Sequence, residues 1–142
     1  MQGVFPQRPS LLPWQGIELR LPMAPWQPHV LRAVATSIAM HEEFTMDIVA
    51  DLELVVDEMH AALSRVAAPI ALLRCVFSNG GDGLTVHAYT FAEPGADLPR
   101  TTVGQYMIAA LAHDVHTWQT TAHDCELDQW HIRATMRRHS SV

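Results

Sequence analysis

The chain has 142 residues, of which 49% are hydrophobic, and this length and composition fit one domain with a single core. Its formal net charge is −6, and its basic residues are nine scattered arginines with no lysine, so it offers no field that would attract a phosphate backbone. We therefore expect no nucleic-acid partner. The acidic charge suits either a basic protein partner or solubility alone.

The sequence gives no sign of export or membrane insertion. No apolar run approaches the roughly 18 residues of a membrane span, and the N-terminus lacks a basic segment followed by an apolar core. Cys75 and Cys125 lack C-x-x-C spacing, which favours neither a disulfide framework nor a metal knuckle. We expect a cytoplasmic protein with no membrane partner.

The first elements follow from proline and from periodicity. Residues 1–16 are rich in proline and glycine, which disfavours a helix, so we expect an extended arm there. Residues 17–21 alternate apolar and polar side chains, which predicts a strand that ends at Pro22. Apolar residues then recur at helical spacing and predict a helix over about residues 27–42.

A second helix should begin at Thr45, because its hydroxyl can accept a hydrogen bond from a free amide of the first turn. Pro69 would end this helix. Residues 70–77 and 84–91 are β-rich, and the glycine-rich connection at residues 78–83 predicts an antiparallel hairpin. One helical stripe at a period of 3.6 residues should face the core: Ile48, Leu52, Val55, Met59, Leu63 and Val66.

The last third of the chain should contain a loop, a helix and two strands. Residues 93–99 are expected to form the loop, and Thr101 or Thr102 to cap a third helix that ends near Asp114. Two short strands are then predicted, separated by a polar turn, at residues 115–121 and 129–137.

The element order β-α-α-β-β-α-β-β predicts an α+β fold. We expect a two-layer sandwich in which the helices cover one face of an antiparallel or mixed sheet. The main domain would span residues 17–138, after the arm, and residues 139–142 would form a short tail.

Three local motifs carry a resemblance to a known family. They are Ile17-Glu-Leu-Arg-Leu-Pro22 followed by a helix with Arg32, Asp51-Leu-Glu-Leu-Val-Val-Asp-Glu58, and Val103-Gly104-Gln-Tyr-Met-Ile-Ala-Ala-Leu-Ala-His-Asp114-Val115. Together with the element order, they resemble the anti-sigma-factor and serine-kinase branch of the GHKL ATPases, which have a histidine-kinase-like fold. The mycobacterial anti-sigma-F type is the most similar, and the resemblance covers about residues 17–138.

The resemblance implies a Mg-ATP site, from which the chain departs at several positions. The family has an Asn four residues after the equivalent of Glu58, and its side-chain oxygen binds Mg²⁺; here Ala62 has no lone pair to offer. The family's Asp-x-Gly-x-Gly loop has only a faint match in this chain, at Glu93-Pro-Gly95-Ala-Asp97. Gly104 is one of two glycines expected around the phosphates, and Arg100 is the only candidate for the lid cation.

We therefore predict an anti-sigma factor that sequesters an alternative RNA polymerase sigma factor, is released by an anti-anti-sigma factor and needs no cofactor. The resemblance implies a partner contact for Arg32, although exposed helix arginines are common. The alternative is an active serine protein kinase that uses ATP and Mg²⁺ on an anti-anti-sigma factor, with Glu58 as general base. A third reading is a structural module that binds neither nucleotide nor sigma factor.

Three further groups of residues can be explained either by a function or by ordinary packing and chance spacing. The stripe Val30, Leu31, Val34 and Ile38 suits either a homodimer or core packing. His113 with His116, and His123 with Cys125, have donor atoms at plausible spacings, but their convergence would be fortuitous and we predict no metal site. The four tryptophans, which are Trp14, Trp26, Trp118 and Trp130, are expected in the core or against the arm.

Overall fold

Five strands form one antiparallel sheet in the computed structural model, which describes residues 16–23, 28–80, 83–121 and 127–138. The predicted element order is confirmed. The elements are β1 (Gly16–Pro22), α1 (Pro28–His41), α2 (Met46–Ser64), β2 (Leu72–Gly80), β3 (Gly83–Ala92), α3 (Val103–Leu111), β4 (Asp114–Thr121) and β5 (Asp128–Arg137).

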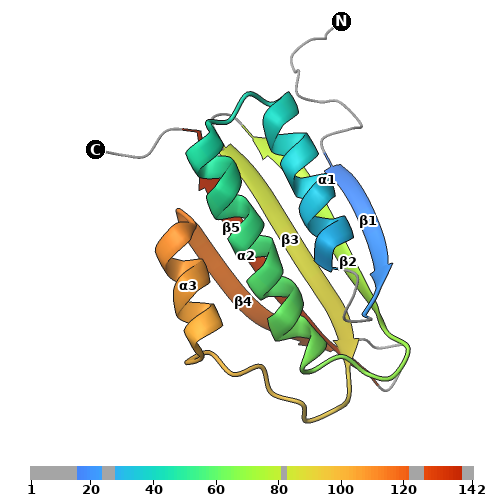
Figure 1. Ribbon diagram of the computed structural model, residues 1–142. Coiled ribbons are helices and arrows are strands. Elements are labelled where there is room, and N and C mark those ends of the chain that lie inside the picture. The colour runs from blue at the N-terminus through green and yellow to red at the C-terminus, as the bar shows by residue number, and fades with distance from the viewer. Residues whose placement is uncertain (1–15, 24–27, 81–82, 122–126, 139–142) are drawn as a thin grey trace, which may run out of the picture.

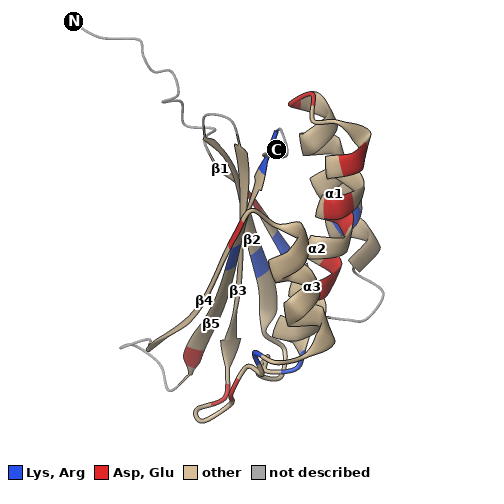
Figure 2. Ribbon diagram, turned by 90° about the vertical axis from the view of Figure 1, so that its left-hand side faces the viewer, with Lys and Arg blue, Asp and Glu red and all other residues tan. Residues whose placement is uncertain are grey.

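The sheet order is β1-β2-β3-β5-β4, so β3 is central and β1 and β4 are the edges. All three helices lie on one face of the sheet, with α2 over its centre, α1 toward β1 and β2, and α3 toward β4 (Figures 1 and 2). This arrangement confirms the predicted α+β sandwich of two layers and decides for an antiparallel sheet. In the part of the chain that the structure describes, no helix has both the length and the apolar character required to cross a bilayer.

The core lies between the sheet and α2. Alternate residues of a strand face the same side, and β3 accordingly buries Leu84, Val86 and Ala88 toward the helices. The predicted α2 stripe is confirmed, because five of its six members are buried and Ile48 packs against the core. Burial raises the pKa of the Cys75 thiol, on β2, to about 12, which makes it a packing group and not a nucleophile.

Threonine caps fix where two helices begin. Thr45 accepts a hydrogen bond from the Ile48 amide (3.3 Å) at the start of α2, and Thr102 accepts one from the Gln105 amide (3.2 Å) at the start of α3. Both predicted caps are confirmed. The predicted end of α2 at Pro69 is wrong, because the Arg65 amide already turns back to the carbonyls of the last turn and the helix ends at Ser64.

The predicted loop at residues 78–83 is also longer than the observed one. The β2–β3 ladder continues through Ser78↔Thr85, Asn79↔Leu84 and Gly80↔Gly83, so the strands absorb both ends of the glycine-rich segment. Gly83 fits this close pairing because a Cβ atom there would lie 2.9 Å from the Met136 carbonyl oxygen. Of the predicted arm, Gly16 belongs to β1, while residues 1–15 and the predicted tail lie outside the described residues.

Candidate functional site between helices α2 and α3

Helix α2 places Glu58 and the predicted metal position one turn apart. Glu58 is half-buried at the edge of the helix, whereas Ala62 is only 7% exposed and belongs to the core cluster. The Ala62 methyl group therefore makes an apolar core contact at the position where the resemblance implies an Asn oxygen.

The structure brings Glu58 and Gly104 together. Gly104 lies in the first turn of α3, and a Cβ atom on it would collide with the Glu58 carboxylate, whose Cδ would be 3.2 Å away. The carboxylate thus lies at the N-terminal end of α3, where free amides and the helix dipole favour negative charge. Glu58 occupies the kind of position in which a helix N-terminus can hold a phosphate.

The loop after β3 is anchored to the core by a tryptophan. Trp130 on β5 is buried and donates a hydrogen bond from Nε1 to the Ala96 carbonyl oxygen (2.9 Å), and the Arg100 guanidinium lies 5.7 Å from the centre of its ring. Glu93 and Gly95 are exposed, and Gly95 has φ +85°, a conformation that suits glycine. Of the predicted loop residues, Arg100 thus lies against Trp130, whereas Glu93 and Gly95 face solvent.

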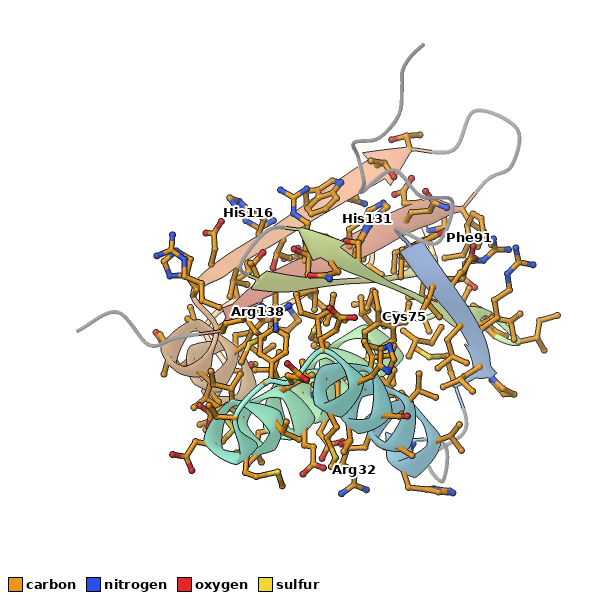
Figure 3. The ribbon with its side chains drawn as sticks, turned by 90° about the horizontal axis from the view of Figure 1, so that it is seen from above. Arg32, Cys75, Phe91, His116, His131 and Arg138 are labelled. Carbon is orange, nitrogen blue, oxygen red and sulfur yellow. The ribbon has the colours of Figure 1, made fainter. Side chains whose placement is uncertain are left out.

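Arg32 lies apart from Glu58 and Gly104, on the surface between α1 and α2. Its Nε atom lies 3.4 Å from Asp57 Oδ1, and its side chain is 43% exposed. In the stick view Arg32 points away from the sheet (Figure 3). The Arg32 guanidinium is thus accessible to solvent, and part of its charge is neutralised by Asp57.

Burial is the main cause of the pKa shifts of Asp57, the ion-pair partner of Arg32, and of His60. Burial raises the pKa of Asp57, which Glu53 also raises, while Arg32 and His60 lower it. Burial likewise lowers the pKa of His60, and Asp57 opposes that shift. Among the described residues, His60 Nε2 is buried without a hydrogen-bond partner. Burial therefore opposes the charged form of Asp57, and Arg32 is the counter-ion that favours it.

A cluster of histidine and aromatic rings lies on the face of the sheet away from the helices, and the sequence did not predict it. His131 on β5 stacks on Trp118 (ring centres 4.8 Å apart, planes at 4°) and on Tyr89 (5.2 Å, 20°), and it is only 7% exposed on a face that no described helix covers. The predicted core position is right for Trp130 and wrong for Trp118, which is half-buried here; packing of Trp118 against the arm stays a prediction, because residues 1–15 lie outside the described residues. Trp14 and Trp26 lie outside the described residues. The signal that could have revealed this face is the period-two alternation of polar and aromatic residues in β3.

Hydrogen bonds fix the tautomers of this cluster. Thr120 donates to Gln129 Oε1 (3.1 Å), so its hydroxyl oxygen accepts from His131 Nε2 (2.9 Å), and His131 Nδ1 then accepts from His87 Nε2 (2.9 Å). Burial lowers the pKa of His131 to about 4, and His87 adds to this shift. Figure 3 shows His131 and His116 on the side of the sheet away from the helices.

The histidines considered as metal ligands do not converge. His116 Nε2 lies 3.0 Å from Asp114 Oδ2 on exposed surface, and His113 is exposed beyond the end of α3. His123 and Cys125 fall outside the described residues. No group of three or more potential ligands that could hold a metal ion is found among the residues described.

Comparisons with known proteins place this geometry in context. No family model matches the chain. The chain is 34% identical, over 89 residues, to the anti-sigma-F factor RsbW of two Mycobacterium tuberculosis strains, CDC 1551 / Oshkosh and H37Rv. The match covers 63% of this chain and 53% of the relative, so the chain spans about half the length of the curated relatives it matches.

A solved structure shares the fold. A chain in the crystal structure of the SiaB-SiaC complex from Pseudomonas aeruginosa superposes with a TM-score of 0.69, covering 84% of this chain and 89% of that chain. The sequence identity is 12%, so this likeness concerns the fold alone. Partial similarity to an anti-sigma factor and a shared α+β fold are thus two separate observations.

Proposed function

We propose that this protein is an anti-sigma factor that sequesters an alternative RNA polymerase sigma factor and is released by an anti-anti-sigma protein. The similarity to an anti-sigma-F factor over 89 residues supports this class. The regulation would rest on competition for a protein surface and would not require phosphoryl transfer. Such a protein would act in the cytoplasm, where the polymerase is.

The observation that carries the proposal is the state of the predicted nucleotide site. Mg²⁺ needs oxygen ligands, and the position that should supply one holds a methyl group packed in the core. Glu58 belongs to the retained part of the family pattern, so its carboxylate beside Gly104 does not count against a nucleotide. The residue at position 62 does not fit a Mg-nucleotide, so we infer a site that binds protein without one.

Co-expression tests the sequestration. Each alternative sigma factor of the host would be produced with a tagged copy of the full chain, and purified complexes would be measured by light scattering and isothermal titration. We expect one sigma factor to form a stoichiometric complex with a dissociation constant at or below micromolar. Failure of every candidate to bind at micromolar concentration would refute the proposal.

One observation favours the alternative function, a serine protein kinase: the Glu58 carboxylate lies at the start of α3. A kinase of this type would need Glu58 as general base and Mg-ATP beside it. Titration with ATP and Mg²⁺ separates the two functions. Saturable binding that Glu58→Gln or Gly104→Val abolishes would support the kinase, and we expect no such binding.

The homodimer stays a prediction. Leu31 is fully buried, and Val30, Val34 and Ile38 pack against the core cluster, so core packing accounts for most of the α1 stripe. A mass measurement of the purified chain by light scattering would decide whether a dimer forms.

A further inference from the structure

A cavity of about 560 Å³ opens between the C-terminal half of α1 and the sheet, apart from the site between α2 and α3. Its apolar walls come from four elements: Ile17 of β1, Ile38 of α1, Phe77 of β2 and Leu84 of β3. In Figure 1 the start of β1 and the C-terminal end of α1 lie at the same end of the molecule. The volume and the apolar lining are those of small-molecule sites.

The cavity exists because α1 covers the edge of the sheet incompletely. The side chains of β1 that face the helices are progressively less buried toward its start: Leu21 is buried, Leu19 is half-buried and Ile17 is 41% exposed. A large apolar side chain left half open to water inside a concavity loses the stabilisation that burial would give. A ligand that covers Ile17 would recover it.

The polar groups at the rim restrict what could bind. Asn79 donates to Glu42 Oε1, and Arg138 also donates to Glu42, through Nη2 to Oε1 (3.3 Å) and through Nη1 to its carbonyl oxygen. The Glu42 carboxylate and the Arg138 guanidinium therefore neutralise each other. A ligand charged with either sign would find little unpaired charge to offset the loss of its own hydration.

Asn79 lines the cavity, and one of its side-chain atoms lacks a partner. Asn79 Oδ1 is buried and accepts no hydrogen bond within the described part of the chain. A buried acceptor without a donor is destabilising, and a donor that reached it would remove that cost. Asn79 therefore favours a ligand with an N–H or O–H group at the end that enters the cavity.

We propose that this cavity is a binding site for a small, mostly apolar, neutral molecule that carries one hydrogen-bond donor. The apolar body would cover Ile17 and Ile38, and the donor would be directed toward Asn79. This site goes beyond the proposed function, and it does not depend on sigma-factor binding.

Three naphthalene probes test the assignment on the full chain. 2-Naphthol carries a neutral donor, 2-methoxynaphthalene carries none, and naphthalene-2-sulfonate is an anion. We expect 2-naphthol to bind saturably, with NMR shift changes at Ile38, Phe77 and Leu84. 2-Methoxynaphthalene should bind about fivefold more weakly, the factor that corresponds to one neutral hydrogen bond, and the sulfonate more weakly still.

Matched variants locate the binding. Ile17→Trp, at a half-exposed edge position, should fill the cavity and abolish binding, whereas Ile70→Trp, at a fully exposed turn, should leave it unchanged. Asn79→Leu should remove the advantage of 2-naphthol over 2-methoxynaphthalene, and thermal unfolding would verify that each variant folds. The proposal is overturned by the absence of saturable 2-naphthol binding, by binding that survives Ile17→Trp in a folded protein, or by equal affinity for the neutral probes.

Discussion

Glu58 and Gly104 form the residue pair on which the account of the nucleotide site depends. The glycine leaves room for the carboxylate, and the carboxylate supplies negative charge to the start of α3. A Cβ atom at position 104 would push the flexible end of Glu58 away. The two residues should therefore be energetically coupled.

A double-mutant cycle measures this coupling. Alanine is favoured over glycine in a helix by about 0.5–1 kcal/mol, and in the wild-type chain this gain should be offset by displacement of Glu58. Gly104→Ala should therefore stabilise the Glu58→Ala protein by about 0.5 kcal/mol more than it stabilises the wild type. Urea unfolding of the four proteins gives the four free energies, and equal effects of Gly104→Ala in both backgrounds would contradict the contact.

His131 should make stability depend on pH. Its pKa is lowered to about 4 in the folded chain, and burial, with Arg133 as a second cause, also lowers the pKa of His87. The unfolded chain takes up these protons near pH 6.5, so the free energy of unfolding should fall as the pH drops from 6.5 toward 4, by at most about 1.4 kcal/mol per pH unit for each proton.

His131→Phe is the matched variant, because it keeps a ring for Trp118 and Tyr89 to stack on. Its unfolding free energy should fall less steeply with decreasing pH than that of the wild type over the same interval. Chemical denaturation at several pH values between 7.5 and 4.5 provides the comparison. Parallel curves for the two proteins would show that His131 does not titrate as inferred.

At the scale of the elements, the turn between α2 and β2 stores strain. The Ala71 amide donates to the Ala68 carbonyl oxygen (3.0 Å), so Pro69 and Ile70 are the central residues of a turn, and Ile70 has φ +59°. A β-branched side chain is disfavoured there, and Ile70 is fully exposed and gains nothing from packing.

Ile70→Gly should therefore stabilise the protein by about 1 kcal/mol, because relief of the left-handed conformation outweighs the extra entropy of an unfolded glycine. Ile70→Val keeps the branched Cβ atom and serves as the control, with little expected change. Thermal and urea unfolding of both variants would measure the effect. A glycine variant no more stable than the valine variant would argue against strain at this turn.

The elements themselves were predictable where local signals are strong. Thr45 and Thr102 mark helix starts through their capping hydroxyls, and Pro22 ends β1 because proline lacks an amide donor. The end of α2 was misplaced because the chain leaves the helix at Arg65 without a proline or glycine to mark it. Strand pairing lengthened the β2–β3 hairpin at the expense of the predicted glycine-rich loop.

The candidate site was predictable only in part. The motifs that carry the resemblance include both Glu58 and Gly104, but their direct contact follows only from how α2 packs against α3. The ring cluster around His131 joins β3 to β4 and β5, from which α3 separates it in the sequence, and the cavity below α1 joins four elements. Neither can be inferred from local periodicity, since each depends on the register and on how far a helix covers the sheet.

At the scale of the whole molecule, negative charge is concentrated on the helical layer. Acidic residues mark α2 and the turn between α1 and α2 in Figure 2, whereas α1 itself carries none, and several arginines lie on the sheet. α2 alone carries five acidic residues: Asp47, Asp51, Glu53, Asp57 and Glu58. If the sigma factor binds this layer through a basic surface, its affinity should respond to charge there and not on the opposite face.

Charge reversal on the two faces tests this orientation. Asp51→Arg on α2 should weaken the sigma-factor complex about fivefold, whereas Glu18→Arg on the far side of the sheet should leave it unchanged. Affinities measured at low and high salt would confirm the electrostatic origin, because screening should reduce the difference. An equal effect of both substitutions would contradict a docking surface on the helices.

The central claim is that the chain binds its partner without a nucleotide. The most direct measurement is isothermal titration of the full chain with the sigma factor captured in co-expression, with and without Mg-ATP. We predict the same dissociation constant in both buffers and no saturable heat when Mg-ATP alone is injected into the chain. Saturable Mg-ATP binding, or a complex that forms only in its presence, would contradict the account.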